Sequence, residues 1–430
     1  MNAVTGGAAG AAVLRRLRNP VHWATAADIF IILVAVSLPW STSLVAIFAL
    51  AWLVAMAPFL ELRVFLYSLK RPVCALPIAL FALAAIGTLW SEAPWGARLY
   101  AVGPAAKLLA LPLLFHHFER SVRGSWVFVA FLVSCTLMMG MSWIVAFEPG
   151  LSLKTIDPQR GIFVKNYIDQ SQEFALCALV LAYPIISLLR AGRIPLALTL
   201  CAIALSLVVN MAFVIVSRTA LVTMPVMLSI FALLHLKWRA NIIILCVVIV
   251  LAALAWMASP QLRWTIETFQ RDYQIYMERD QPTSIGLRLE FWQKSFRFIS
   301  EAPVYGHGTG STRGLFEQAA TGPKVLAGGQ VVANPHNQTL NVAIQWGVLG
   351  IAVLYAMWLV HLRLFNGDGL AAWIGLMVVV QNVCSSLFNS HIFDFHEGWM
   401  YVLGVGVAGG MVLRTRSREA AQALRNSAKS

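Results

Sequence analysis

Apolar runs long enough to cross a lipid bilayer recur along most of this chain of 430 residues, and they constrain its fold more than any other feature. The runs are about 17–23 residues long, close to the ~20 residues that a membrane-spanning α-helix needs. A backbone in lipid must satisfy its own hydrogen bonds, which favours helices. We therefore predict an all-α polytopic integral membrane protein.

Composition agrees with this class. Hydrophobic residues make up 59% of the chain and charged residues 12%, whereas a soluble domain carries roughly 25% charged residues. The net charge of +13 comes from basic residues in loops between apolar runs, not from a basic soluble domain, so we exclude nucleic-acid binding. The six cysteines are isolated within apolar runs, which predicts neither a disulfide framework nor a cysteine metal site.

Twelve transmembrane spans can be placed along the sequence. We predict them at residues 24–40, 43–60, 73–90, 99–118, 125–147, 172–189, 194–216, 219–236, 240–258, 338–362, 369–388 and 396–413. The chain then divides into a membrane domain over 1–258, a periplasmic loop domain over 259–337, and a second membrane domain over 338–430 that ends in a basic cytoplasmic tail.

The distribution of lysine and arginine predicts the orientation. These residues gather in alternate short loops and in the tail, which places both termini in the cytoplasm by the positive-inside rule. Three longer segments then face outward: 148–171, 259–337 and 390–397. In the largest, aromatic and charged residues at helical spacing predict a surface helix over 261–280, and a second helix is expected over 284–300. The glycine-rich stretch 306–311 predicts a turn.

Three residues on the outward side are candidates for chemistry, each with a plainer alternative. Arg218 lies between two apolar runs, where an arginine either snorkels to the interface or binds an anion. Arg288 lies near the expected start of a loop helix, where its guanidinium and the first amides could meet a phosphate, or it faces solvent. His336 could act as a base, while its neighbours Asn334 and Asn337 could simply cap the following helix.

Metal and nucleotide chemistry are not predicted. The residues His307, His391, Asp394, His396 and Glu397 lack a recognisable ligand spacing, so Asp394 and Glu397 are expected to orient a base or to lie near acceptor sugars. No P-loop, HExxH or GxSxG motif is present, and we predict no metal, no cofactor and no use of ATP.

Four short motifs, in this order and placement, resemble the O-antigen ligase family: Ser217 to Leu221, Gly286 to Arg288, Gly306 to Gly310, and Pro335 to Asn337. The resemblance implies a GT-C-like fold in the inner membrane of a Gram-negative bacterium, with a periplasmic active site. It also implies transfer of a glycan from undecaprenyl diphosphate to lipid A–core, by a metal-independent inverting reaction.

The resemblance implies catalytic roles for His336, Arg218 and Arg288. Residues assigned to substrate binding are Arg160, Lys165, Asn166, Asn337, His307 and Asp394. The expected partners are the lipid-linked donor, the lipid A–core acceptor and membrane lipids. Alternatives within the superfamily are an O-antigen polymerase and a protein O-oligosaccharyltransferase. A membrane transporter or exporter is the non-enzymatic alternative, although it predicts charges near the bilayer midplane, which these spans nearly lack.

Overall fold

The computed structural model describes residues 20–153, 161–235, 237–323 and 325–427, and these residues form helices and connecting loops without a β-strand. The apolar helices before the large loop are α2 (Pro20–Ser37), α3 (Thr42–Met56), α4 (Leu62–Ser68), α5 (Pro72–Ile86), α6 (Trp95–Ala106), α7 (Ala110–Arg120), α8 (Gly124–Phe147), α9 (Tyr167–Val180), α10 (Ala182–Arg190), α11 (Ile194–Phe213), α12 (Arg218–His235) and α13 (Trp238–Ala258). After the loop come α17 (Gln338–Leu364), α18 (Leu370–Ser385) and α19 (Phe395–Ser427).

Each predicted span overlaps one of these helices or an adjoining pair. Two expected spans are interrupted, one by the 3-10 turn Lys107–Leu109 between α6 and α7, the other between α9 and α10. By length and apolar composition, six helical segments could cross a membrane, the two interrupted ones among them, or up to eight if each of two bent pairs forms one span. A polytopic helical membrane protein is thus confirmed. The count of twelve crossings and their orientation remain predictions.

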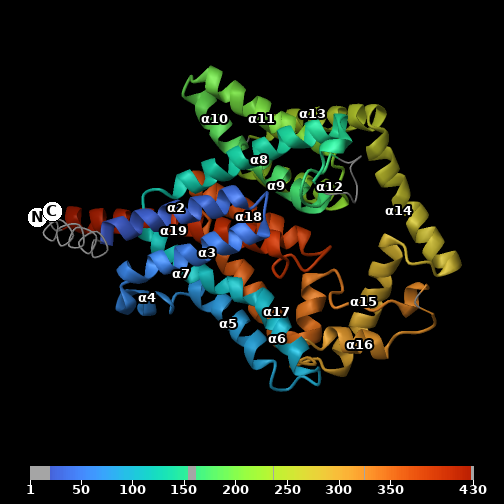
Figure 1. Cartoon of the computed structure of the whole chain (residues 1–430). Coiled ribbons are helices and arrows are strands. Elements are labelled where there is room, and N and C mark those ends of the chain that lie inside the picture. The colour runs from blue at the N-terminus through green and yellow to red at the C-terminus, as the bar shows by residue number, and fades with distance from the viewer. Residues whose placement is uncertain (1–19, 154–160, 236, 324, 428–430) are drawn as a thin grey trace, which may run out of the picture.

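Loops predicted to be cytoplasmic meet at one end of the bundle. Arg71 pairs with Glu119 at 2.9 Å, and Arg123 pairs with Asp28 at 3.0 Å. Arg414 on α19 donates a hydrogen bond to the backbone of the same α7–α8 loop. The helices of the large loop lie at the other end of the bundle (Figure 1). This separation is the one expected for loops on opposite faces of a membrane.

The large loop contains the two predicted helices and one more: α14 (Pro260–Arg279), α15 (Ser284–Glu301) and α16 (Thr312–Gln318). The chain bends by 91° between α13 and α14, which turns the amphipathic α14 away from the preceding apolar helix. Gly286 allows α15 to approach α14, since a Cβ there would lie 2.4 Å from side-chain atoms of Tyr276. A small core of Phe291, Phe298, Phe316 and Ile344 joins α15 and α16 to α17.

The glycine-rich turn fixes the loop to the membrane helices. The amides of His307 and Gly308 donate to the carbonyls of Ile344 and Gln345 on α17, at 2.8 and 2.9 Å. These carbonyls are available because α17 is broken at Gly347, which has φ +59° and packs against the carbonyl of Val304. The first part of α17, and the loop that precedes it, are thereby held against α15.

Candidate active site

Arg218 is the first residue of α12, and its side chain reaches the loop helix α14. The guanidinium Nη2 lies 3.2 Å from Oδ2 of Asp272, and its carbon lies 4.6 Å from the centre of the Phe269 ring. The side chain is 20% exposed. These contacts do not fit a snorkelling side chain, because the charge is directed at a protein partner.

Arg288 lies in the first turns of α15 and is half-buried. It makes no hydrogen bond or ion pair with any residue that the structure describes. Burial lowers the pKa of Arg288, Tyr167 opposes this effect, and the Arg218 cation lowers that pKa further. Two neighbouring guanidinium groups, of which only that of Arg218 is paired within the described residues, form a region suited to an anion.

Part of the predicted contribution of the amides at the start of this helix is used within the helix itself, and contact of the remaining amides with a phosphate stays a prediction. Thr283 caps α15 and its hydroxyl accepts the N–H of Gly286 at 3.2 Å. The N–H of Leu287 is taken by the Thr283 carbonyl. Because these two donors are used within the helix, the guanidinium of Arg288 is the charged group that this segment offers to a phosphate.

His336 adopts a backbone conformation that is uncommon for a residue with a side chain, with φ +55°. Its N–H donates to Oδ1 of Asn334 at 2.9 Å, and its Nδ1 lies 3.0 Å from Oδ1 of Asn389. The imidazole stacks on Phe291, with 6.2 Å between ring centres and a 29° interplanar angle. Burial lowers the pKa of His336, the bond to Asn389 opposes this, and the Arg288 cation lowers it further. A lowered pKa favours the neutral form of the ring at pH 7.

Asn337, and not His336, caps α17. The Oδ1 of Asn337 accepts the N–H of Leu340 at 3.1 Å, and its Nδ2 donates to the Leu387 carbonyl at 3.2 Å. The expected capping function of the flanking amide is confirmed. Since the imidazole is not needed for the cap, it is available for another purpose.

Other residues predicted to bind substrate have mostly structural partners. Lys165 donates to the carbonyl of Leu38 and lies 3.5 Å from Glu173, and Asn166 caps α9 through the amides of Ile168 and Asp169. The His307 Nε2 is 2.8 Å from the Phe298 carbonyl. Arg160 lies outside the described residues. Direct substrate contact by these four residues remains a prediction.

Asp394 lies in the loop between α18 and α19, close to the His336 network. Its Oδ2 accepts a hydrogen bond from Nδ2 of Asn389 at 2.5 Å. Burial raises the pKa of Asp394 to about 6, although the nearby Lys107 cation opposes this effect. The Lys107 ammonium donates to the carbonyls of Phe393 and Asp394. It therefore stabilises the loop that carries Asp394.

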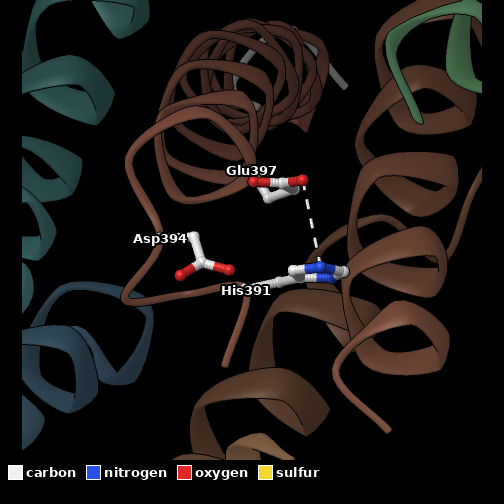
Figure 2. Close-up of side chains that lie close together, drawn as sticks. All are labelled: His391, Asp394 and Glu397. Carbon is white, nitrogen blue, oxygen red and sulfur yellow. Dashed lines mark ion pairs between the residues drawn. The ribbon is translucent and has the colours of Figure 1, made fainter. Parts of the chain in front are cut away.

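His391, Asp394 and Glu397 point toward one another (Figure 2), and one potential ligand atom from each lies within 4.8 Å of the others. Nε2 of His391 lies 3.9 Å from Oε1 of Glu397. The three could hold a metal ion, which their spacing in the sequence did not indicate. However, Asp394 already accepts a hydrogen bond from Asn389, and Lys107 supplies a positive charge beside it. The absence of a metal remains a prediction.

Sequence motifs did not indicate three residues of this region. Asn389 joins Asp394 to His336, Asp272 pairs with Arg218, and Tyr167 lies near Arg288. Each belongs to a segment distant in sequence from its partner. A polar residue at the end of an apolar run is the only signal for Asn389, and it is too common to be specific.

Together, the fold and these side chains define a polytopic helical membrane protein with two arginines and a neutral histidine gathered at one end of its bundle. The family model described as O-antigen ligase matches residues 201–355, a segment that contains all three. This match confirms the predicted resemblance and supports placing the chain in the O-antigen ligase superfamily. No curated protein matches the sequence significantly.

Proposed function

We propose that the protein is an O-antigen ligase that transfers a glycan from undecaprenyl diphosphate to a sugar hydroxyl of lipid A–core. The observation that carries the proposal is the gathering of Arg218, Arg288 and His336 from three separate segments. Together they offer two cations and one neutral base, which is the chemistry that glycosyl transfer from a diphosphate requires.

The reaction proceeds by displacement at the anomeric carbon. The acceptor hydroxyl oxygen forms a bond to that carbon, and the bond from the carbon to the phosphate oxygen breaks. The electron pair of that bond leaves with the lipid diphosphate, whose charge Arg218 and Arg288 stabilise. The hydroxyl proton passes to Nε2 of His336, because the neutral imidazole can accept it at pH 7. Attack opposite the leaving group inverts the anomeric configuration.

In this proposal the guanidinium groups supply the positive charge that a divalent ion would otherwise provide. The active site faces the periplasm of a Gram-negative cell, and the diphosphate donor is already activated, so ATP is not consumed. The support for this location is the predicted orientation and the position of the loop helices at the end of the bundle opposite the basic loops (Figure 1).

The test uses purified protein and lipid-linked glycan, in detergent with lipid A–core, a second lipid-linked glycan or a protein as acceptor, and in vesicles without an acceptor. A product on lipid A–core, formed equally with and without EDTA, is expected. A lengthened lipid-linked glycan would instead identify a polymerase, and a glycosylated protein acceptor would identify an oligosaccharyltransferase. Movement of intact lipid-linked glycan across vesicles without transfer would identify a transporter. Loss of transfer in EDTA that a divalent ion restores would contradict the role of the arginines.

A further inference from the structure

A hydrogen-bond network behind His336 determines which ring nitrogen carries the proton. Amide orientations and histidine tautomers follow from such networks, provided that one member has a fixed direction. Here the fixed member is the backbone N–H of His336, which can only donate. It lies 2.9 Å from Oδ1 of Asn334, so that atom is an acceptor. Ser390 Oγ donates to the same oxygen at 2.8 Å.

The orientation of Asn334 determines the direction of its hydrogen bond to Asn389. With its oxygen facing the His336 amide, Asn334 presents Nδ2 as a donor to Asn389, at 2.9 Å. The facing atom of Asn389 must accept this bond and is therefore Oδ1. Its Nδ2 then faces Asp394, where the carboxylate accepts it at 2.5 Å. The backbone at one end and the carboxylate at the other specify the same orientation of Asn389.

The imidazole is the remaining member. Nδ1 of His336 lies 3.0 Å from Oδ1 of Asn389, an atom that can only accept, so Nδ1 must carry a proton. A neutral ring protonated on Nδ1 has its lone pair on Nε2. That nitrogen makes no hydrogen bond to any residue in the described part of the chain.

We propose that Asn389 is a positioning residue, which with Asn334 and Asp394 holds His336 in the tautomer that directs the Nε2 lone pair at the acceptor hydroxyl. The inference about catalysis rests on the proposed function, whereas the tautomer itself does not. When the hydroxyl proton reaches Nε2, the imidazolium keeps its Nδ1–H bond to Asn389, so no rearrangement accompanies proton transfer. Asp394 acts through Asn389 and does not touch the ring.

The network is sensitive to the protonation of Asp394, which faces charged groups from several elements. Lys107 lies on the α6–α7 turn, Asp169 on α9, and Glu397 on α19. A protonated Asp394 no longer requires a donor, so one of the two constraints on Asn389 is lost and only the Asn334 amide holds its orientation. The Nδ1–H tautomer of His336 is then held less firmly, and a larger share of the tautomer with its proton on Nε2, which has no lone pair for the hydroxyl, is expected.

The first test reads the tautomer directly. Protein labelled with ¹⁵N in its histidine rings is measured by NMR at pH 7.5, and a His336→Gln sample assigns the signals. We expect a protonated Nδ1 and an unprotonated Nε2 in the unmodified protein. We expect a mixture of tautomers in Asn389→Leu. A proton on Nε2 in the unmodified protein would overturn the proposal, whether or not the protein transfers glycans.

The second test reads catalysis. Asn389→Leu is expected to lower the transfer rate at saturating donor by roughly 10- to 100-fold, less than the loss of the base itself, with the donor KM unchanged. In a His336→Gln background it should have no further effect. Asn389→Asp retains the acceptor for Nδ1 and should recover part of the rate, with the acid limb of the pH profile moved to higher pH.

The control is Asn210→Leu, which removes a buried amide bonded to Ser142 at 3.2 Å in the membrane bundle. It should leave the pH profile unchanged. An equal loss of rate from Asn389→Leu with and without His336 would show a merely structural residue and refute the assignment. If Asn389→Leu fails to fold, the tautomer of the unmodified protein still decides the matter. If no acceptor receives glycan, only the proposed function fails.

Discussion

Arg288→Gln is the most informative single change, because it removes a charge without removing a protein contact. Arg288 has no hydrogen bond or ion pair within the described residues, and burial together with the Arg218 cation lowers its pKa. Within the described residues, the fold therefore loses no hydrogen bond or ion pair when this charge is removed. We therefore expect an unchanged or slightly higher melting temperature and a large loss of transfer.

The size of the loss follows from the charge. A unit charge about 4 Å from a growing phosphate charge, at an effective dielectric constant of about 20, contributes about 4 kcal/mol. Loss of one preorganised donor typically lowers the rate by about 10²–10³-fold, and the upper end of this range corresponds to the same free energy of about 4 kcal/mol. Arg288→Gln should therefore lower the transfer rate by about 10³-fold. Arg218→Gln should lower the rate less, by about 10²-fold. The Asp272 carboxylate, 3.2 Å from the Arg218 guanidinium, already offsets part of its charge.

A second measurement separates this explanation from general damage. The Arg288 cation lowers the pKa of His336, so its removal raises that pKa. The base must be neutral to work, and a higher pKa keeps it protonated up to a higher pH. The acid limb of the pH profile should therefore move upward while the plateau falls. General damage to the fold would lower the plateau rate without moving the acid limb of the pH profile.

The assay compares initial rates of glycan transfer between about pH 5 and 9, at saturating donor. Arg297→Gln is the matched control: it lies on the same helix, is 72% exposed, and pairs with Glu301 at 3.1 Å. It should retain the unmodified rate, because exposed ion pairs contribute little. If Arg288→Gln retains more than about a tenth of the rate, or if its acid limb does not move, the electrostatic argument is refuted.

Two further predictions concern the support of the site. Lys107→Met should raise the pKa of Asp394 above about 6, because it removes the cation that lowers that pKa. The transfer rate should fall at pH 7 and recover toward pH 8.5. A loss of rate that does not depend on pH would contradict this prediction. Gly286→Ala places a Cβ 2.4 Å from the Tyr276 side chain, so overpacking of about 1–3 kcal/mol should lower the melting temperature by a few degrees. Gly314→Ala, with no atom within 4 Å of its Cβ, should not lower it, and equal shifts in thermal unfolding would refute the packing argument.

The parts of the fold that depend on local pattern were predictable. Apolar runs placed the helices, and aromatic and charged residues at helical spacing placed α14 and α15 within a residue or two. The interruption of α17 was not predictable, because Gly347 looks like any glycine in an apolar helix. Only its contact with the Val304 carbonyl explains why the helix breaks there.

The site was predictable only to the extent that single residues stood out locally. Arg218 and His336 were conspicuous because charged and titratable residues are rare beside apolar runs. Their partners Asp272 and Asn389 lie 54 and 53 positions away and have no unusual local context. For Lys165 and Asn166 the local sequence did not reveal their structural partners. They appeared available in a polar loop, yet one bonds to the Leu38 carbonyl and the other caps α9.

The contacts indicate that the two arginines contribute differently. Arg218 is fixed by Asp272 and Phe269, so it also fastens α14 to the start of α12. Within the described residues Arg288 makes no hydrogen bond or ion pair, and neither the Arg218 cation nor the His336 ring compensates its charge. An anion bound beside Arg288 would remove the repulsion between the guanidinium groups and contact a segment held by Arg218. Donor binding should therefore order α14 and α15, and glycan transfer should depend on the loop as much as on the membrane helices.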